Sequence, residues 1–407
     1  MKFYVLLVVA CAAFLAACEL SLRWMLPDEA PSTADYEMLE ADDVLGYRLG
    51  PSLDAVFERT AANGGDRIRW RTNARGFRGD ELAATNIPRI VVYGDSNVQA
   101  VFSKDANTFP EQLESLVSLE LGRSVEVVNA GVIGYGPDHY LLRMTIDLPL
   151  LQPDLVVMTI FADNDLGDPL RHRLFEVRDG QLTRRSDHFT YPRSSLVERA
   201  QRFARQLSIT RAALKALSAI RLLPDAGVGA SDQPDTVAAR IRQLDDLAAL
   251  AFARYRTPGS EFLRGDYYDI DVAVAPESEP ARAKLSLLAA ILSEAKATAD
   301  RAGVPLLVVI EPSSVDLTTL DPVNHETLAR AYESYDRRRL TRSIEELCRS
   351  ASIDVINLYD TFSHNAPETL YFGDGDSHWN DAGQRLAAET VAPRVTARLN
   401  EVLPTAR

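Results

Sequence analysis

The chain has 407 residues, of which 46% are hydrophobic and 25% are charged, and its formal net charge is -14. This composition is typical of a globular protein, and the length allows one large domain with insertions or two domains. The negative charge argues against nucleic-acid binding, because a phosphate-binding surface needs clustered lysine and arginine.

The first 26 residues form an apolar leader. Lys2 precedes an apolar run over residues 3–18, whose length fits a signal-peptide core better than a full membrane span. Small residues before Cys18 resemble a bacterial lipoprotein cleavage box, whereas the apolar residues that resume after Glu19 fit an uncleaved signal anchor. Simple secretion is a third interpretation. We therefore expect the catalytic part outside the cytoplasm, in the cell envelope and anchored at the membrane.

Residues 27–86 form an N-terminal extension with a basic stretch at 69–79. This stretch predicts a short strand followed by a glycine turn. Its arginines either meet an anionic group of a substrate or lie on a solvated edge, and a solvated edge is the commoner case.

From residue 87 onward, strand-like and helix-like stretches alternate. Short apolar runs predict buried strands at 90–93, 125–129, 154–161, 305–310 and 353–358. Helices are predicted at 109–121, at 280–302 and from 381 onward; Pro110 and Gly122 mark the start and the end of the first one. This alternation predicts a parallel sheet covered by helices on both faces, built from residues 87–166 and 281–403.

Residues 167–280 interrupt this pattern and form a mainly helical insertion, which we expect to cap the site. Asp179 and Gly180 are typical of a hairpin turn. Residues 194–223 predict a basic amphipathic helix, either on a membrane or over the site or, more commonly, packed on the surface of the protein. Residues 224–234 predict a loop.

Ser96 follows the first strand directly, after Gly94 and Asp95. Gly94 can adopt positive φ and end the strand, and ligands of open α/β sheets bind at the carboxyl ends of the strands. A serine acts as a nucleophile only with a base, a carboxylate that orients the base, and donors for the oxyanion. The alternative is an ordinary polar turn.

Of the six histidines, His378 alone has neighbours that look organised for chemistry. It lies in a loop after the last strand, at the sheet edge where Ser96 is expected, so the two side chains can meet. Asp376 and Asp374 are the candidate carboxylates that would hold its imidazole in the correct tautomer.

Two further loops offer donors for an oxyanion. Glycines within residues 129–136, after the second strand, allow a backbone amide to approach a bound oxygen. Asn164, after the third strand, has a side-chain amide that can donate to the same oxygen.

These motifs resemble the four blocks of the SGNH, or GDSL-type, esterase and lipase superfamily. They are Gly-Asp-Ser-Asn at 94–97, the glycine loop at 129–136, Asn-Asp at 164–165 and Asp-x-His at 376–378. The resemblance implies a three-layer α/β/α sandwich with a parallel, flavodoxin-like sheet. It also implies that Ser96 is the nucleophile and first oxyanion donor, Gly134 the second donor, Asn164 the third and His378 the base.

Two positions depart from the family pattern. Ala162 stands where the third block usually begins with glycine. The family acid usually lies three residues before the histidine, where this chain has Gly375. The spacing of Asp376 is instead similar to that of polysaccharide O-acetyltransferase-like members.

Three classes of function follow. The first is an envelope-anchored serine esterase that acts on ester or O-acetyl groups of a small molecule or glycan, without cofactor or metal, or an acyltransferase with the same site. The second is a metal-dependent phosphoesterase, since the same residue types can hold two metals. The third is a catalytically silent binding module.

Overall fold

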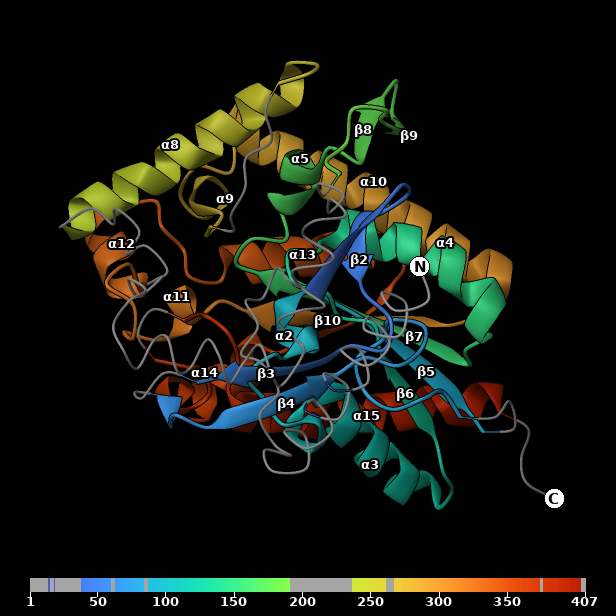
Figure 1. Cartoon of the computed structure of the whole chain (residues 1–407). Coiled ribbons are helices and arrows are strands. Elements are labelled where there is room, and N and C mark those ends of the chain that lie inside the picture. Colours follow the sequence, from blue (N-terminus) through green and yellow to red (C-terminus); the bar gives the residue numbers. More distant parts are fainter. Residues whose placement is uncertain are drawn as a thin grey trace, which may run out of the picture.

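The computed structural model describes residues 38–403 apart from 60–62, 84–86, 191–235, 261–266 and 374–375, and in addition Phe14 and Cys18. A five-stranded parallel sheet forms its centre (Figure 1). The strands are β5 (Arg89–Tyr93), β6 (Glu126–Asn129), β7 (Leu155–Ala162), β10 (Leu306–Pro312) and β11 (Asp354–Asn357). Each lies within two residues of its predicted position.

The strand order is β6-β5-β7-β10-β11. Numbered along the sheet's own strands this is 2-1-3-4-5, the flavodoxin-like order, which confirms the predicted topology. The order reverses between β5 and β7, and ligands of such sheets bind outside the carboxyl ends of the strands at this point. Ser96 follows β5 and Asn164 follows β7, so both lie at the reversal.

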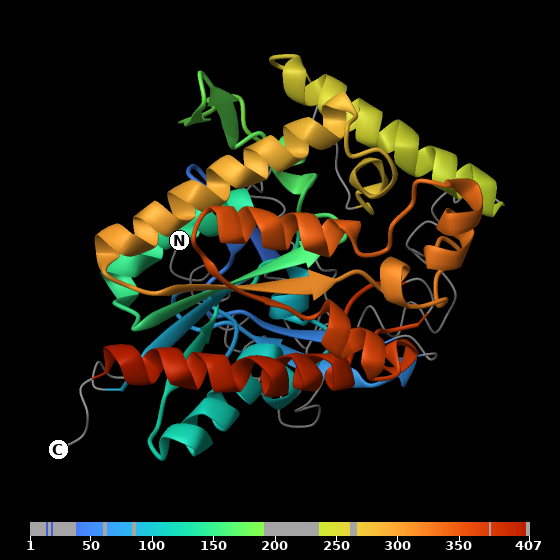
Figure 2. The same ribbon diagram turned by 180° about the vertical axis from the view of Figure 1, so that it is seen from behind.

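Helices cover both faces of the sheet (Figure 2). They are α3 (Phe109–Leu121) and α15 (Asp381–Val402) on one face, and α4 (Pro137–Leu151), α10 (Glu279–Ala302) and α13 (Arg339–Ser350) on the other. Successive side chains of a strand point to opposite faces, so Ile90 and Val92 pack with the first pair while Val91 and Tyr93 pack with the second group. The predicted three-layer architecture is therefore present.

Local signals set the ends of the helices. Thr108 caps α3, Pro110 lies in its first turn, and Gly122 ends it with a φ of 65°. The side chain of Asn380 accepts hydrogen bonds from two amides at the start of α15. The predicted bounds of α3 are confirmed, and those of α10 and α15 agree to within a residue.

The N-terminal extension forms two antiparallel hairpins. They are β1 (Leu39–Asp42) with β2 (Gly46–Leu49), and β3 (Asp54–Glu58) with β4 (Arg67–Arg71). Along β4 the side chains of Ile68 and Trp70 are buried and the intervening arginines are exposed. Gly76 and Gly79 follow with positive φ, so the predicted strand and glycine turn are confirmed.

The described part of the insertion packs on the outer side of α10. It consists of α5 (Asp168–His172), β8 (Phe175–Arg178), β9 (Gln181–Arg184), α8 (Val237–Arg256) and α9 (Ile270–Val274). Asp179 and Gly180 both have positive φ and turn the β8–β9 hairpin, as predicted. The expected basic helix at 194–223 and the loop at 224–234 lie outside the described residues, and the cap role stays a prediction.

Short helices in the second half of the described chain include α11 (Ser314–Leu317), α12 (His325–Ala331) and α14 (Tyr359–His364). None of the helices in the described ranges is both long and apolar enough to cross a membrane. Apart from Phe14 and Cys18, the predicted leader lies outside those ranges.

Candidate active site

Ser96 is the first residue of the short helix α2 (Ser96–Gln99), directly after β5. The carboxylate of Asp95 accepts a 2.8 Å hydrogen bond from the Asn97 N–H and so caps this helix. The Ser96 residue is only 5% exposed. The hydroxyl is thus held at the carboxyl edge of the sheet in a largely water-free setting.

Gly94 is needed for close packing and not for the positive φ that we expected. Its φ lies outside the left-handed region. A Cβ atom here would lie 2.2 Å from Val98 Cγ2 and 2.4 Å from Thr159 Oγ1. The missing side chain therefore lets the end of β5 lie against both α2 and β7.

His378 meets Ser96 across 282 positions of the sequence. The Ser96 hydroxyl lies 2.7 Å from His378 Nε2, and His378 Nδ1 lies 2.6 Å from Asp376 Oδ1. A carboxylate accepts from Nδ1–H, and this leaves a lone pair on Nε2 that can take the proton of the serine. The structure thus brings together the three residues that sequence reasoning selected as nucleophile, base and acid.

The Asp376 carboxylate orients His378 and is itself held in place by the backbone of His378. Its Oδ1 also accepts a 3.0 Å hydrogen bond from the backbone N–H of His378. Burial raises the pKa of the Asp376 carboxyl, but the hydrogen bonds and the charge of His378 outweigh burial, so this pKa lies below its usual value. Asp376 is therefore ionised at neutral pH. The alternative acid, Asp374, lies outside the described residues.

Asn97 joins the two halves of the site, and sequence reasoning missed it. Its Oδ1 accepts from the Trp379 N–H at 2.9 Å, and its backbone carbonyl accepts from Gln384 Nε2 at 2.8 Å. Gln384 Oε1 in turn accepts from the Phe109 N–H at 2.7 Å. These bonds fix α2 to the His378 loop and to α15. The signal was the polar residue inside the Gly-Asp-Ser-Asn block, although its partner is distant in the sequence.

The two expected oxyanion residues lie in loops at the same sheet edge. Gly134 has a φ of 69°, and its carbonyl accepts from the Tyr47 hydroxyl of β2. The backbone carbonyl of Asn164 accepts from Arg171 at 3.3 Å. The loop that holds Gly134 is fixed near Ser96 by a 3.1 Å hydrogen bond from the Val132 N–H to the Gly94 carbonyl. The donor roles of Gly134 and Asn164 stay predictions that rest on the family resemblance and on the position of both loops at this sheet edge.

Arg78 is buried behind the nucleophile helix, and this corrects the expectation of a solvated edge. Its guanidinium donates to the backbone carbonyls of Gln99, Ala100 and Ser103 and pairs with Asp105 at 2.8 Å. It therefore neutralises the carbonyl end of α2. Arg69 and Arg71 of the stretch are exposed as expected and pair with acids, Arg69 with Asp54 at 2.6 Å and Arg71 with Asp80 at 3.1 Å.

Buried carboxyl groups lie beneath the site. Burial and the nearby charge of Asp95 raise the pKa values of Glu311 and Asp165 well above their usual range. Both shifts favour the protonated, uncharged form of these carboxyls. This direction lowers the negative charge that would oppose an anion at Ser96.

A small apolar hollow adjoins the reacting pair. It has a volume of about 10 Å³, roughly what one water molecule needs. The side chains that line it beside Ser96 and His378 include Ala100, Val101, Phe102, Phe372 and Trp379. The hollow lies directly beside the Ser96 hydroxyl and the His378 imidazole.

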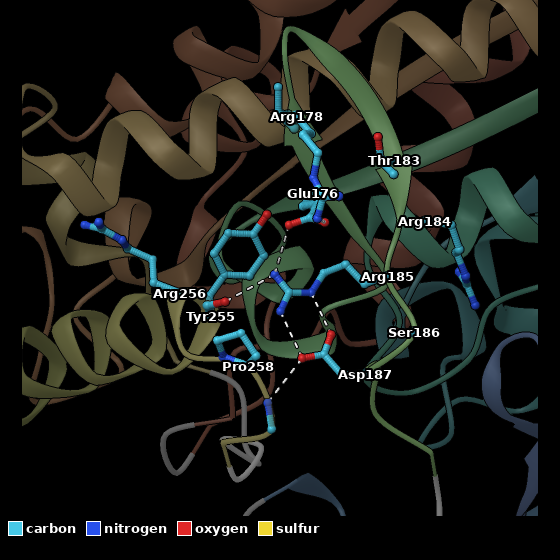
Figure 3. Close-up of a pocket in the computed structure, with 12 residues that line it drawn as sticks. Glu176, Arg178, Thr183, Arg184, Arg185, Ser186, Asp187, Tyr255, Arg256 and Pro258 are labelled. Carbon is cyan, nitrogen blue, oxygen red and sulfur yellow. Dashed lines mark hydrogen bonds and ion pairs between the residues drawn. The ribbon is translucent and has the colours of Figure 1, made fainter.

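A larger cavity of about 620 Å³ lies elsewhere, between the β8–β9 hairpin and the end of α8 (Figure 3). Arg185 lies 2.9 Å from Asp187 and Arg256 lies 2.7 Å from Glu279, whereas Arg184 donates to the backbone carbonyl of Val44. None of the residues predicted for catalysis lines this cavity.

The flavodoxin-like sheet carries serine, histidine and aspartate assembled at its carboxyl edge, and the C-terminal part of the chain is similar to an SGNH hydrolase-like family. Residues 267–406 match the family model described as the SGNH hydrolase-like domain of the acetyltransferase AlgX. The matched region holds Asp376 and His378, while Ser96 lies outside it.

Several solved structures resemble the chain at low identity. A lipase/acylhydrolase from Enterococcus faecalis is 13% identical with a TM-score of 0.35, and the match covers 79% of this chain and 100% of that one. The acetyl xylan esterase AlAXEase is 14% identical with a TM-score of 0.37 (75% and 99%), and the two-domain esterase CEX, active on acetylated mannans, is 10% identical with a TM-score of 0.37 (79% and 52%). A search of curated protein sequences gave no match.

Proposed function

We propose that the protein is a serine-dependent O-acyl esterase or acyltransferase that forms an acyl-enzyme on Ser96. The observation that carries this proposal is the continuous chain of contacts from the Ser96 hydroxyl to His378 at 2.7 Å and from His378 to Asp376 at 2.6 Å. Acyl transfer by serine needs this arrangement of nucleophile, base and orienting acid.

The proton follows the same contacts. His378 Nε2 accepts the proton of Ser96 as its oxygen attacks the ester carbonyl, and then returns it to the leaving alcohol. Asp376 stabilises the imidazolium in between. Backbone donors at Ser96 and Gly134, with the amide of Asn164, are proposed to bind the oxyanion. Water or a second hydroxyl then resolves the acyl-enzyme, with His378 again acting as base.

The acyl group is proposed to be acetyl. Support comes from the hollow of about 10 Å³ beside Ser96 and from the match to a family described as an acetyltransferase. The size of the hollow predicts a fall in kcat/KM of more than about tenfold from p-nitrophenyl acetate to p-nitrophenyl butyrate, since overpacking a tight apolar site costs about 1–3 kcal/mol. Equal rates on both esters would contradict the acetyl assignment.

A serine-directed fluorophosphonate tests the nucleophile directly. We expect mass spectrometry to locate the label on Ser96 in the wild type and on no serine in Ser96→Ala, while Ser350→Ala, on the exposed end of α13, labels normally. Hydrolysis of p-nitrophenyl acetate should fall by about 10³-fold or more in Ser96→Ala. Activity that survives in Ser96→Ala but is lost with a chelator would instead favour the metal-dependent phosphoesterase class.

Transfer and hydrolysis are separated by adding an acceptor. Acetylated oligosaccharide is incubated with the enzyme, with and without an unacetylated oligosaccharide, and both free acetate and acetylated acceptor are measured. A transferase converts acceptor at the expense of free acetate, and an esterase releases the same acetate in both cases. If the wild type and Ser96→Ala show no turnover and are indistinguishable, the binding-module class is favoured.

We also propose that the chain is held at the outer face of a membrane by its leader. Support comes from Lys2, the apolar run that follows and the small residues before Cys18. Mass spectrometry of the mature N-terminus distinguishes the cases: a diacylated Cys18 indicates a lipoprotein, an intact Met1 indicates an anchor, and an unmodified later residue indicates secretion. A membrane-free protein with an intact leader would contradict the proposal.

A further inference from the structure

A second cluster of chemically active side chains lies away from Ser96. Asp138 and His139 lie in the first turn of α4, and His172 ends α5. All three residues are buried, and His139 is only 1% exposed. One donor atom from each lies within 4.8 Å of the other two. Sequence reasoning passed over these histidines because they stand in unrelated stretches.

The donor atoms converge on one carboxylate. His172 Nδ1 lies 3.0 Å from Asp138 Oδ1 and 3.2 Å from Oδ2, and His139 Nδ1 lies 3.4 Å from Oδ1. Two imidazole nitrogens therefore face the same Asp138 oxygen from different elements.

The hydrogen bonds of His139 define its tautomer. Its Nε2 lies 3.0 Å from the backbone carbonyl of Leu45. A carbonyl oxygen only accepts, so Nε2 carries a proton, and in the neutral ring Nδ1 then presents a lone pair. Within the described part of the chain this Nδ1 has no hydrogen-bond partner, although it is buried. The ring cannot easily turn away, because it stacks on Tyr135 with centroids 4.1 Å apart.

A lone pair that faces a carboxylate oxygen at 3.4 Å is repulsive, and a cation between the two atoms removes the repulsion. We propose that Asp138, His139 and His172 bind a divalent transition-metal ion, with zinc as the best fit. Tetrahedral zinc at about 2.0–2.2 Å from its donors separates them by about 3.3–3.5 Å. The separations of 3.0 and 3.4 Å lie close to this range. Two nitrogens and one carboxylate favour zinc over calcium or magnesium, which prefer oxygen donors.

The position of this site indicates a structural role. Asp138 and His139 follow the loop that holds Gly134, and His172 follows the loop that holds Asn164. An ion shared by α4 and α5 would fix the two loops relative to each other without taking part in chemistry at Ser96. The existence of the metal site does not depend on the proposed acyl transfer.

The test uses the full chain purified without a polyhistidine tag. After removal of metal by a chelator and dialysis, zinc is added back, and bound zinc is measured by mass spectrometry of the metal. We expect about one zinc per chain and a rise in melting temperature of about 5 °C. Cobalt in place of zinc should give the visible absorption of a tetrahedral site.

His139→Gln and His172→Gln should abolish the cobalt spectrum and the thermal shift, while His364→Gln, at the exposed end of α14, should leave both unchanged. Should the histidine variants fail to fold, the zinc content and the cobalt spectrum of the wild type still decide. No bound metal and no thermal shift in the wild type would overturn the proposal, as would unchanged binding in folded His139→Gln. Labelling of Ser96 is scored separately, so its failure is distinguishable from that of the metal site.

Discussion

The backbone N–H of Trp379 donates a 2.9 Å hydrogen bond to Oδ1 of Asn97. The residue that follows the histidine is thereby bound to the residue that follows the serine. Together with the bonds of Gln384, this contact holds the base near the nucleophile, because each reacting side chain lies one position away from it. Preorganisation of the site thus depends on the side-chain amide of Asn97, which contacts none of the reacting atoms.

Asn97→Ala should therefore weaken both the fold and the reaction. Loss of the acceptor leaves the buried Trp379 N–H without a partner, which costs about 1–3 kcal/mol. The looser His378 loop should lower kcat by about 10- to 100-fold. Urea unfolding and ester hydrolysis measure the two effects, and the exposed Asn365→Ala serves as control. Wild-type kcat in Asn97→Ala would show that the loop is held by other contacts.

Asp376→Asn should lower kcat by about 10³- to 10⁴-fold, since an amide no longer favours the tautomer of His378 with its proton on Nδ1. Asp374→Asn should change kcat by less than about threefold if Asp376 alone orients the imidazole. Both variants are assayed with the same acetyl ester, after their unfolding curves show that they are folded. The reverse order of effects would transfer the role of the acid to Asp374.

Gly131→Ala should displace the loop that carries Gly134. A Cβ atom at position 131 would lie 2.3 Å from the Gln99 amide nitrogen and 2.7 Å from the Val98 carbonyl carbon, and neither backbone atom can move without shifting α2. We expect a loss of about 2 kcal/mol or more in stability and at least a tenfold fall in kcat.

Gly122→Ala is the matched control for this loop variant. Gly122 has positive φ, but nothing lies within 4 Å of an added Cβ atom. The Gly122→Ala substitution should lower the free energy of unfolding by about 1 kcal/mol through backbone strain and leave kcat unchanged. If both variants behave alike, close approach at Gly131 does not position the loop.

Asp316 predicts a pH dependence of stability. It is fully buried, and its Oδ1 accepts from the hydroxyls of Tyr268 at 2.7 Å and Tyr335 at 2.6 Å. Burial raises the pKa of this carboxyl to about 8. The folded state then keeps a proton that the unfolded chain releases near pH 4, so this contribution to stability is complete below pH 4 and is lost as the pH rises to 8.

Between pH 5 and 8 the wild type should lose about 1 kcal/mol per pH unit more than Asp316→Asn, whose amide does not titrate. Urea unfolding at each pH measures the difference. The exposed Asp300→Asn, which removes a surface partner of Lys296, should keep the wild-type slope. Parallel curves for the wild type and Asp316→Asn would mean that the Asp316 carboxyl is ionised when folded.

The sheet was predictable because each strand is a short apolar run buried on both faces, and such runs carry their own signal. The bounds of α3 followed from Pro110 and Gly122 for the same local reason. Ser96, His378 and Asp376 were found because their strand positions place them at one edge of the sheet. Local composition and strand order were sufficient for these features.

Other features depend on contacts that no local pattern reports. Arg78 looked like a surface charge, because only the folded chain shows the carbonyls that it satisfies. Asn97 and Gln384 bond across the whole sequence, and His139 and His172 meet only when α4 and α5 pack. Gly94 was predicted to be needed for its conformational freedom, but the structure needs it for its small size. A sequence does not distinguish these two reasons for a glycine.

Strand β7 pairs with β10 from Val156 opposite Leu306 to Ala162 opposite Pro312, and this pairing joins the N-terminal half of the sheet to its C-terminal half. If the protein were synthesised as two separate polypeptides, divided between positions 190 and 236, the first would contain the nucleophile Ser96 and the second the base His378. Neither piece would be reactive alone. Recovery of chromogenic ester hydrolysis on mixing the two pieces would show that β7 and β10 had paired.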